Sequence, residues 1–190
     1  MCEYVVRNGI CYNQFAYGTQ LLFMQNRIRR EWLCTDPKKV YLIDRSLYED
    51  RHIFAKLFFD LGLLDEGEYN EYRDMFEKIV RNMDPPDCFV LLNSDPEVCY
   101  QRLRELNHPL DVWLTLDMIK KMDYLYRTRL KERVVLYNPK IKLLEIDTTK
   151  HESLLDATNE IAIQLSKLYG DKFNSVSNST NKNHKTACID

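Results

Sequence analysis

The chain has 190 residues, of which 45% are hydrophobic, so it is long enough to form one compact domain with a buried core. Its formal net charge of −2 provides no basic surface for nucleic acid, and no apolar run approaches the roughly 20 residues that span a bilayer. The 6 cysteines show no CxxC-type spacing, and the first residues lack the apolar core of a signal peptide, so we expect an intracellular protein with reduced thiols.

The first recognisable element is a long helix. Residues 1–13 show no clear pattern. From about residue 14 to residue 34, apolar side chains recur at intervals that suit a helix, with polar residues between them. Asp36-Pro37 then ends this helix, because proline cannot continue it and restricts the residue before it.

A strand-to-helix junction comes next. Val40 to Ile43 is a short apolar run typical of a buried strand, and it stops at Asp44, Arg45 and Ser46. Helical spacing begins after Ser46, which suits the N-cap position. Ligands bind at this carboxyl edge of an open α/β sheet, where Asp44 can accept a hydroxyl proton and Arg45 can bind a phosphate. An ordinary ion pair at a strand end is the alternative, and the dipeptide alone favours it.

The rest of the chain alternates helices with apolar runs. We predict further helices at about 46–61, 65–82, 96–106, 116–133 and 152–169, and strands at 88–92 and 141–146. Strands separated by helices require right-handed crossovers and a parallel sheet flanked by helices. Three strands are few for a doubly wound fold, and no glycine lies in a G-x-x-x-x-G-K-[ST] loop. We therefore expect the first strand and the phosphate loop of such a fold to be missing from this chain.

The residues after Ile43 carry a family resemblance. DRSLYEDRHIFA resembles the [DE]-R-S-x-Y-x-D-R-x-x-F segment of the deoxynucleoside kinases, which have the P-loop kinase fold and transfer a phosphoryl group to the 5′-hydroxyl of a deoxynucleoside. The resemblance implies that Asp44 is the general base and that Arg45 steadies the transferring phosphoryl group. It extends over most of the chain, so we expect a kinase-like domain at 14–170. The composition beyond that domain is rich in Asn, Ser and Lys, and we expect a disordered polar tail at 171–190.

A second set of matches concerns the nucleobase. TQLLFMQNRIR resembles a family helix in which a glutamine precedes an arginine by seven residues. The resemblance implies that Gln20 pairs with the base through its amide, which both donates and accepts hydrogen bonds. It also implies that Arg27 and Asp50 contact the base edge as a charged pair, as in members that act on deoxycytidine or purine deoxynucleosides, and that Phe54 packs on the base. Taken singly, Gln20 and Arg27 would be ordinary polar residues of a helix.

A third set of matches concerns the phosphoryl donor and the sugar. Arg102 matches an arginine that approaches the donor nucleotide. Asp147 begins the segment DTTKHE, which matches the family loop that borders the donor adenine. Asp111 falls where an acidic residue holds the sugar 3′-hydroxyl, although a loop carboxylate without a partner is an equally good interpretation. The resemblance implies ATP and Mg²⁺ as cofactors, with their main binding loop absent from this chain.

The chain also departs from the family pattern. Leu106 and His108 stand where the family's lid supplies phosphate-binding arginines, and a neutral imidazole is a poor substitute for a guanidinium. Thr19 replaces an aromatic residue just before the glutamine. The tyrosine that assists at the 3′-hydroxyl has no clear counterpart, and Tyr4 or Tyr12 could stand in for it.

The leading hypothesis is therefore a deoxynucleoside kinase of nucleotide salvage that uses ATP and prefers purine deoxynucleosides or deoxycytidine to thymidine. A catalytically inactive kinase-like subunit or fragment is the alternative, while Gln20, Arg27 and Asp50 disfavour a nucleoside monophosphate kinase. We expect a small-molecule deoxynucleoside as the binding partner, with no nucleic acid and no membrane, and a homodimer is compatible with the family. We expect a cytoplasmic location, with the mitochondrion as the alternative.

Overall fold

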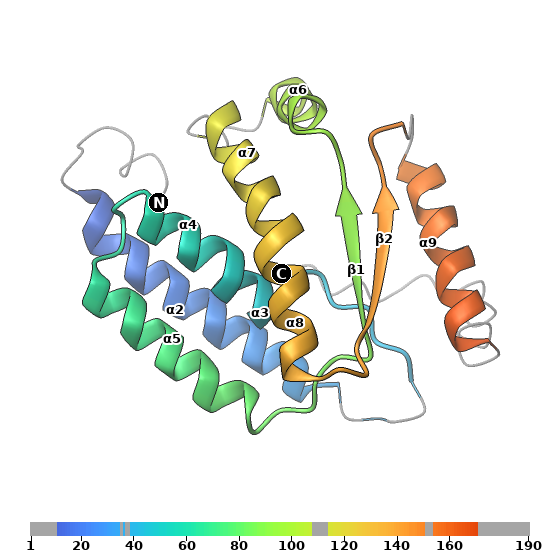
Figure 1. The fold of residues 1–190 in the computed structure, drawn as a ribbon, viewed down its shortest axis with the longest axis horizontal. Helices are drawn as coiled ribbons and strands as arrows, with labels where there is room; N and C mark the ends of the chain where they lie inside the picture. The colour runs from blue at the N-terminus through green and yellow to red at the C-terminus, as the bar shows by residue number, and fades with distance from the viewer. Residues whose placement is uncertain (1–10, 35, 37–38, 108–113, 151–153, 171–190) are drawn as a thin grey trace.

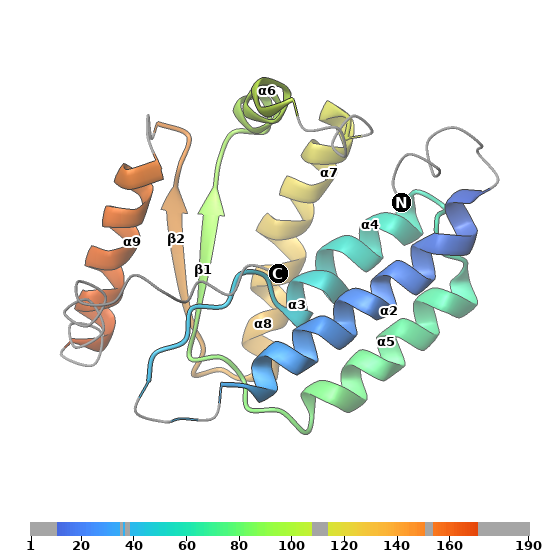
Figure 2. The ribbon, with the colours of Figure 1, turned by 180° about the vertical axis from the view of Figure 1, so that it is seen from behind.

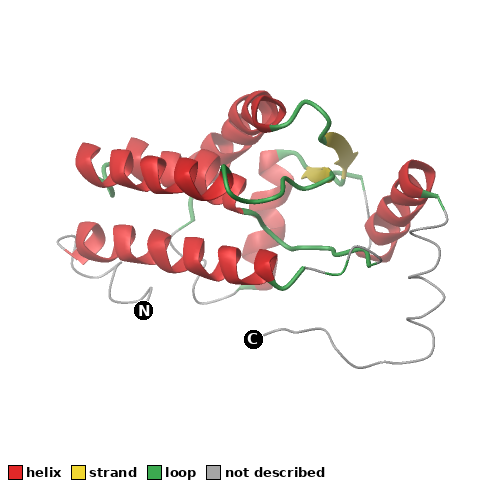
Figure 3. Ribbon diagram, turned by 90° about the horizontal axis from the view of Figure 1, so that it is seen from below, coloured by secondary structure: helices red, strands yellow, loops and turns green. Residues whose placement is uncertain are grey.

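The structure, a computed structural model, describes residues 11–34, 36, 39–107, 114–150 and 154–170. Helices α2, α4 and α5 lie side by side in one group, helices α7 and α8 stand between this group and a small parallel sheet, and α9 lies beside strand β2 (Figures 1 and 2). The sheet is a minor part of this helix-rich α/β fold (Figure 3). No helix within the described residues is both long and apolar enough to cross a membrane.

Most elements lie close to where the sequence predicts them. The first long helix is α2, and the turn at Asp44 and Arg45 leads into α3, the π-helical turn η1 and α4. A second π-helical turn, η3, joins α7 to α8. The bounds are α2 Cys11–Trp32, α3 Leu47–Glu49, η1 Asp50–Phe54, α4 Ala55–Asp60, α5 Glu66–Val80, β1 Cys88–Asn93, α6 Pro96–Leu106, α7 Leu116–Leu125, η3 Tyr126–Leu130, α8 Lys131–Tyr137, β2 Lys142–Asp147 and α9 Leu154–Tyr169.

The sheet aligns the ends of two strands. Strands β1 and β2 pair in parallel, from Cys88 opposite Lys142 to Asn93 opposite Asp147. The connection between them runs through α6, α7, η3 and α8, as a parallel crossover requires. Asn93 and Asp147 therefore stand next to each other at the carboxyl edge of the sheet, where ligands bind in open α/β folds.

The prediction of a buried strand at Val40–Ile43 is wrong. These residues lie outside any strand, and the side chain of Leu42 is 72% exposed. The run has the composition of a strand, but a strand also needs a neighbour that satisfies its backbone and layers that cover its faces. Within the described residues the sheet consists of β1 and β2 alone, so this segment has no paired neighbour.

The core fixes the junction segment in place. Tyr48, the tyrosine of the DRSLYED segment, is buried, and its ring meets three other aromatic rings edge to face. The ring centroids lie 5.7 Å from Phe76 on α5, 5.4 Å from Phe89 on β1 and 5.2 Å from Tyr137 on α8. Helix α3 is thus held against three separate parts of the fold, and this contact positions the residues on either side of Tyr48.

Candidate functional site

The turn before α3 brings Arg45 and Phe54 together. Ser46 caps the helix as the sequence predicts, because its Oγ accepts a hydrogen bond from the backbone N–H of Glu49 at 3.2 Å. Arg45 has a φ of 61°, a left-handed conformation that non-glycine residues seldom adopt and that concentrates at functional sites. Its guanidinium carbon lies 4.8 Å from the centroid of the Phe54 ring, and a guanidinium nitrogen lies 3.8 Å from Glu49 Oε1.

Asp44 stands at the surface of the same turn. Its backbone carbonyl accepts a hydrogen bond from Arg30 Nη2 at 2.8 Å, which ties the turn to the end of α2. Its carboxylate is exposed and so is accessible to a bound hydroxyl group. Asp44 and Arg45 therefore share one turn, which follows an irregular segment rather than the predicted strand.

Arg27 and Asp50 form a buried ion pair. Arg27 Nε donates to Asp50 Oδ2 at 3.2 Å, and Asp50 is only 2% exposed. Burial raises the pKa of Asp50 to about 6; the charge of Arg27 acts in the opposite direction, and the nearby Glu49 raises the pKa further. A carboxyl group with such a pKa, desolvated beside a fixed cation, is typical of binding and catalytic sites.

Two buried polar groups, on α2 and α5, have unused hydrogen-bonding capacity. Gln20 is 1% exposed, and its Oε1 has no hydrogen-bond partner within the described residues. The hydroxyl group of Tyr72 on α5 is also buried without a partner, and burial followed by the charge of Asp50 raises the pKa of Tyr72 above its usual range. An unpaired buried polar group costs about 1–3 kcal/mol, so both groups are suited to hydrogen-bond a ligand.

Tyr72 is a residue that the sequence did not reveal as part of the site. Its spacing with Tyr69 and Phe76 predicts a side chain on the buried face of a helix, and all three side chains are indeed buried. Periodicity does not indicate whether a buried tyrosine will find a partner for its hydroxyl group. That question depends on how α5 packs against η1, which the sequence pattern does not specify.

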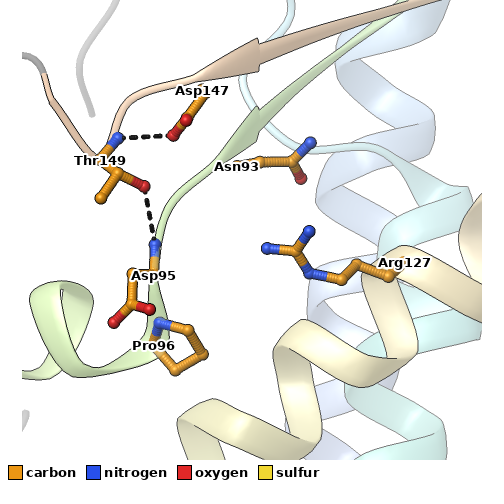
Figure 4. Close-up of a pocket in the computed structure, with 6 residues that line it drawn as sticks. All are labelled: Asn93, Asp95, Pro96, Arg127, Asp147 and Thr149. Atoms are coloured by element: carbon orange, nitrogen blue, oxygen red, sulfur yellow. Dashed lines mark hydrogen bonds between the residues drawn. The ribbon is translucent and has the colours of Figure 1, made fainter.

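A second polar region lies at the carboxyl ends of the strands. It is a pocket of about 350 Å³ lined by Asn93, Asp95, Pro96, Arg127, Asp147 and Thr149 (Figure 4). The backbone N–H of Thr149 donates to Asp147 Oδ1 at 2.9 Å, and the backbone N–H of Asp95 donates to Thr149 Oγ1 at 3.0 Å. These bonds join the loop after β2 to the loop after β1, so the pocket has a defined wall.

Arg102 stabilises this wall. Its Nη2 donates to the backbone carbonyls of Thr148 and Thr149, at 3.0 and 3.3 Å, and its Nη1 lies 3.5 Å from Ser94 Oγ. The predicted donor-side residues Arg102 and Asp147 are thus part of one region. Asp111, the predicted sugar-binding residue, lies outside the described residues, as do His108 and Tyr4.

The helix-rich α/β fold with a small parallel sheet is consistent with the P-loop kinase fold. A family profile described as deoxynucleoside kinase matches residues 12–174. The chain therefore belongs to the deoxynucleoside kinase family.

Individual relatives support the family without defining one substrate. The chain is 25% identical over 130 residues to deoxyadenosine kinase of Dictyostelium discoideum, covering 68% of this chain and 52% of that protein. It is 27% identical over 105 residues to deoxyadenosine/deoxycytidine kinase of Bacillus subtilis, covering 53% and 48%. It is 32% identical over 88 residues to human mitochondrial thymidine kinase 2, covering 46% and 33%. The chain thus spans about half or less of the length of these relatives.

Proposed function

We propose that this chain contributes the nucleoside-binding side of a deoxynucleoside kinase that transfers the γ-phosphoryl group of ATP to a 5′-hydroxyl group, with purine deoxynucleosides or deoxycytidine preferred to thymidine. The observation that carries the proposal is the buried Arg27–Asp50 pair, together with the buried and unpartnered Gln20 Oε1 and Tyr72 hydroxyl. A nucleoside that fits there would satisfy these groups and would place its sugar toward the turn that holds Asp44 and Arg45.

The acceptor chemistry follows from that turn. Asp44 would accept the proton of the 5′-hydroxyl group as the phosphoryl group arrives, because its exposed carboxylate is accessible to a ligand. Arg45 would bind the transferring phosphoryl oxygens, and Phe54 would pack against the base. The stacking of Arg45 on Phe54 at 4.8 Å links these two functions, because the same contact orders both side chains.

The preference among bases follows from hydrogen bonding. Purine and cytosine edges offer amino or imino donors for Asp50 together with ring acceptors for Arg27. Thymine presents two carbonyls, one N–H and a methyl group, and the methyl group would clash sterically with the charged pair. Leaving either charged partner unpaired in a desolvated pocket costs about 1–3 kcal/mol or more, so thymidine should bind less tightly.

We assign ATP to the pocket at the strand ends. A volume of about 350 Å³ lies within the range of ligand sites, and Thr149 and Asp147 offer polar atoms to a nucleotide. Mg²⁺ would enter with the donor phosphates, since it commonly keeps few protein ligands in kinases, and there it would offset the negative charge of the phosphates. A role in nucleotide salvage, a cytoplasmic or mitochondrial location and a homodimer complete the proposal.

Calorimetric titration with deoxycytidine, deoxyadenosine, deoxyguanosine and thymidine tests the acceptor site without requiring catalysis. We expect at least one of the first three to bind more tightly than thymidine, and the double variant R27M/D50A to shift preference toward thymidine. Arg73→Gln, which removes an exposed ion pair with Asp74 on α5, serves as a control that should leave all affinities unchanged. Tighter binding of thymidine than of all three others to the unmodified protein would refute the assignment of Arg27 and Asp50.

A kinase-like protein that binds nucleosides without transferring phosphate is the second candidate. It is favoured by one observation: none of the 5 glycines lies in a G-x-x-x-x-G-K-[ST] loop, which in P-loop enzymes holds the donor phosphates. We expect the 190-residue polypeptide to show little or no ATP-dependent phosphorylation. Turnover of roughly 1–100 per second would instead establish it as an ordinary kinase.

A further inference from the structure

Arg127 extends into the pocket at the strand ends from the opposite side. It belongs to η3, and its guanidinium lies near Asn93 and points into the space toward Asp95 and Thr149 (Figure 4). Arg127 Nε donates to both carboxylate oxygens of Asp123, each at 2.8 Å. Within the described residues its Nη1 and Nη2 have no hydrogen-bond partner, and the side chain is 48% exposed. The outer edge of the guanidinium therefore remains available to a ligand.

The nearby carboxylates are already engaged elsewhere. Glu145 accepts hydrogen bonds from Lys131 Nζ and from Asn93 Nδ2, the latter at 3.0 Å. Asp95 caps α6 by accepting from the backbone N–H groups of Glu97 and Val98. Asp147 accepts from the backbone N–H of Thr149. Their negative charges are partly offset by these donors, so an anion can approach the free edge of Arg127 without displacing an existing partner.

The other cations expected on the donor side do not present such an edge. Arg102 donates to the loop carbonyls, and Arg104 donates to the backbone carbonyl of Leu114. Leu106, where the family resemblance predicts a phosphate-binding arginine, is an apolar side chain that is 76% exposed. A guanidinium binds phosphate through a planar pair of N–H donors, and Arg127 has that pair directed into the pocket.

We propose that Arg127 binds the phosphate groups of the donor nucleotide in this pocket and takes over the role that lid arginines would otherwise fill. The inference rests on the proposed function, because it assigns the donor nucleoside triphosphate to the strand-end pocket. Arg127 contacts the donor rather than the deoxynucleoside acceptor. Its removal therefore weakens the binding of ATP without affecting adenosine or the acceptor.

The test compares ATP with adenosine, which lacks the phosphates. Calorimetric titrations use the 190-residue protein and its Arg127→Gln variant, with Arg73→Gln as the matched control for the loss of an exposed arginine paired with a neighbouring aspartate. We expect Arg127→Gln to lower ATP affinity at least tenfold and to leave adenosine affinity unchanged, while Arg73→Gln changes neither. Unchanged ATP affinity in Arg127→Gln, or no ATP binding by the unmodified protein, overturns the proposal.

Two further titrations make the result specific. Asp123→Asn removes the counter-charge of Arg127 and should leave ATP affinity the same or raise it; a tenfold loss would show that the ion pair, not the free edge, supports binding and would overturn the proposal. Deoxynucleoside titrations of the same samples separate the two levels of inference. If deoxynucleosides bind but Arg127→Gln leaves ATP affinity unchanged, only the role of Arg127 is refuted. If the unmodified protein binds no deoxynucleoside, the proposed function is refuted.

Discussion

Nucleoside binding should weaken in mild acid because of Asp50. Its carboxyl group must be ionised to accept hydrogen bonds from the amino or imino groups of a base. With a pKa of about 6, the ionised fraction is about 97% at pH 7.5 and about 9% at pH 5.0. If only the ionised form binds, affinity for the preferred deoxynucleoside falls about tenfold over this range, which corresponds to about 1.4 kcal/mol.

The cations that act on Asp50 and the nearby histidine do not obscure this titration. Arg27 and Arg45 stay charged throughout the range, and the pKa of the nearby His52 is lowered to about 3 by burial and by neighbouring arginines, so His52 stays neutral. Calorimetry at several pH values would measure the effect in the unmodified protein and in Asp50→Asn. The variant should bind weakly with a flat pH profile. A flat profile in the unmodified protein, or an unaltered slope in Asp50→Asn, would refute the reasoning.

Two further predictions concern the general base and the stability of α5. In a form of the protein that includes a phosphate loop, Asp44→Asn should lower kcat by about 10²–10⁴-fold with little change in nucleoside affinity, and near-normal kcat would mean that the base is misassigned. Asp65→Ala removes the capping box at the start of α5, in which the side chains of Asp65 and Glu68 accept hydrogen bonds from each other's backbone N–H groups. Urea unfolding should show that the free energy of unfolding falls by about 1 kcal/mol. The control Glu66→Gln should cause no measurable loss.

The sequence predicts the helices and two strands well because their signals are local. Ser46 caps its helix as predicted, since an N-cap depends only on the next few residues. Val40–Ile43 fails because a strand depends on a partner elsewhere in the chain, and composition alone does not reveal whether that partner is present. The family resemblance predicts that Gln20, Arg27 and Asp50 contact the same base. The described structure places Arg27 and Asp50 in direct contact.

The remaining site features depend on packing between distant elements. Tyr72 and Arg127 have ordinary positions in helical patterns, one on a buried face and one on an exposed face. What distinguishes them is the unpartnered hydroxyl group of the first and the free guanidinium edge of the second. Neither property can be inferred from spacing, because each depends on which groups from other elements lie within hydrogen-bonding distance.

The π-helical turn η1 explains how consecutive polar residues of the DRSLYED segment and its continuation all become part of the interior. Asp50, Arg51 and His52 are buried in succession, which the regular 3.6-residue period of an α-helix does not favour. Each meets a different element: Asp50 contacts Arg27 on α2, Arg51 Nη1 donates to the Tyr69 hydroxyl on α5 at 2.9 Å, and His52 Nε2 lies 3.2 Å from the Tyr137 hydroxyl on α8. Such turns occur frequently at functional sites. Here the turn brings Asp50 against Arg27 while its two neighbours contact α5 and α8, so the same local geometry both holds the ion pair and ties the surrounding helices together.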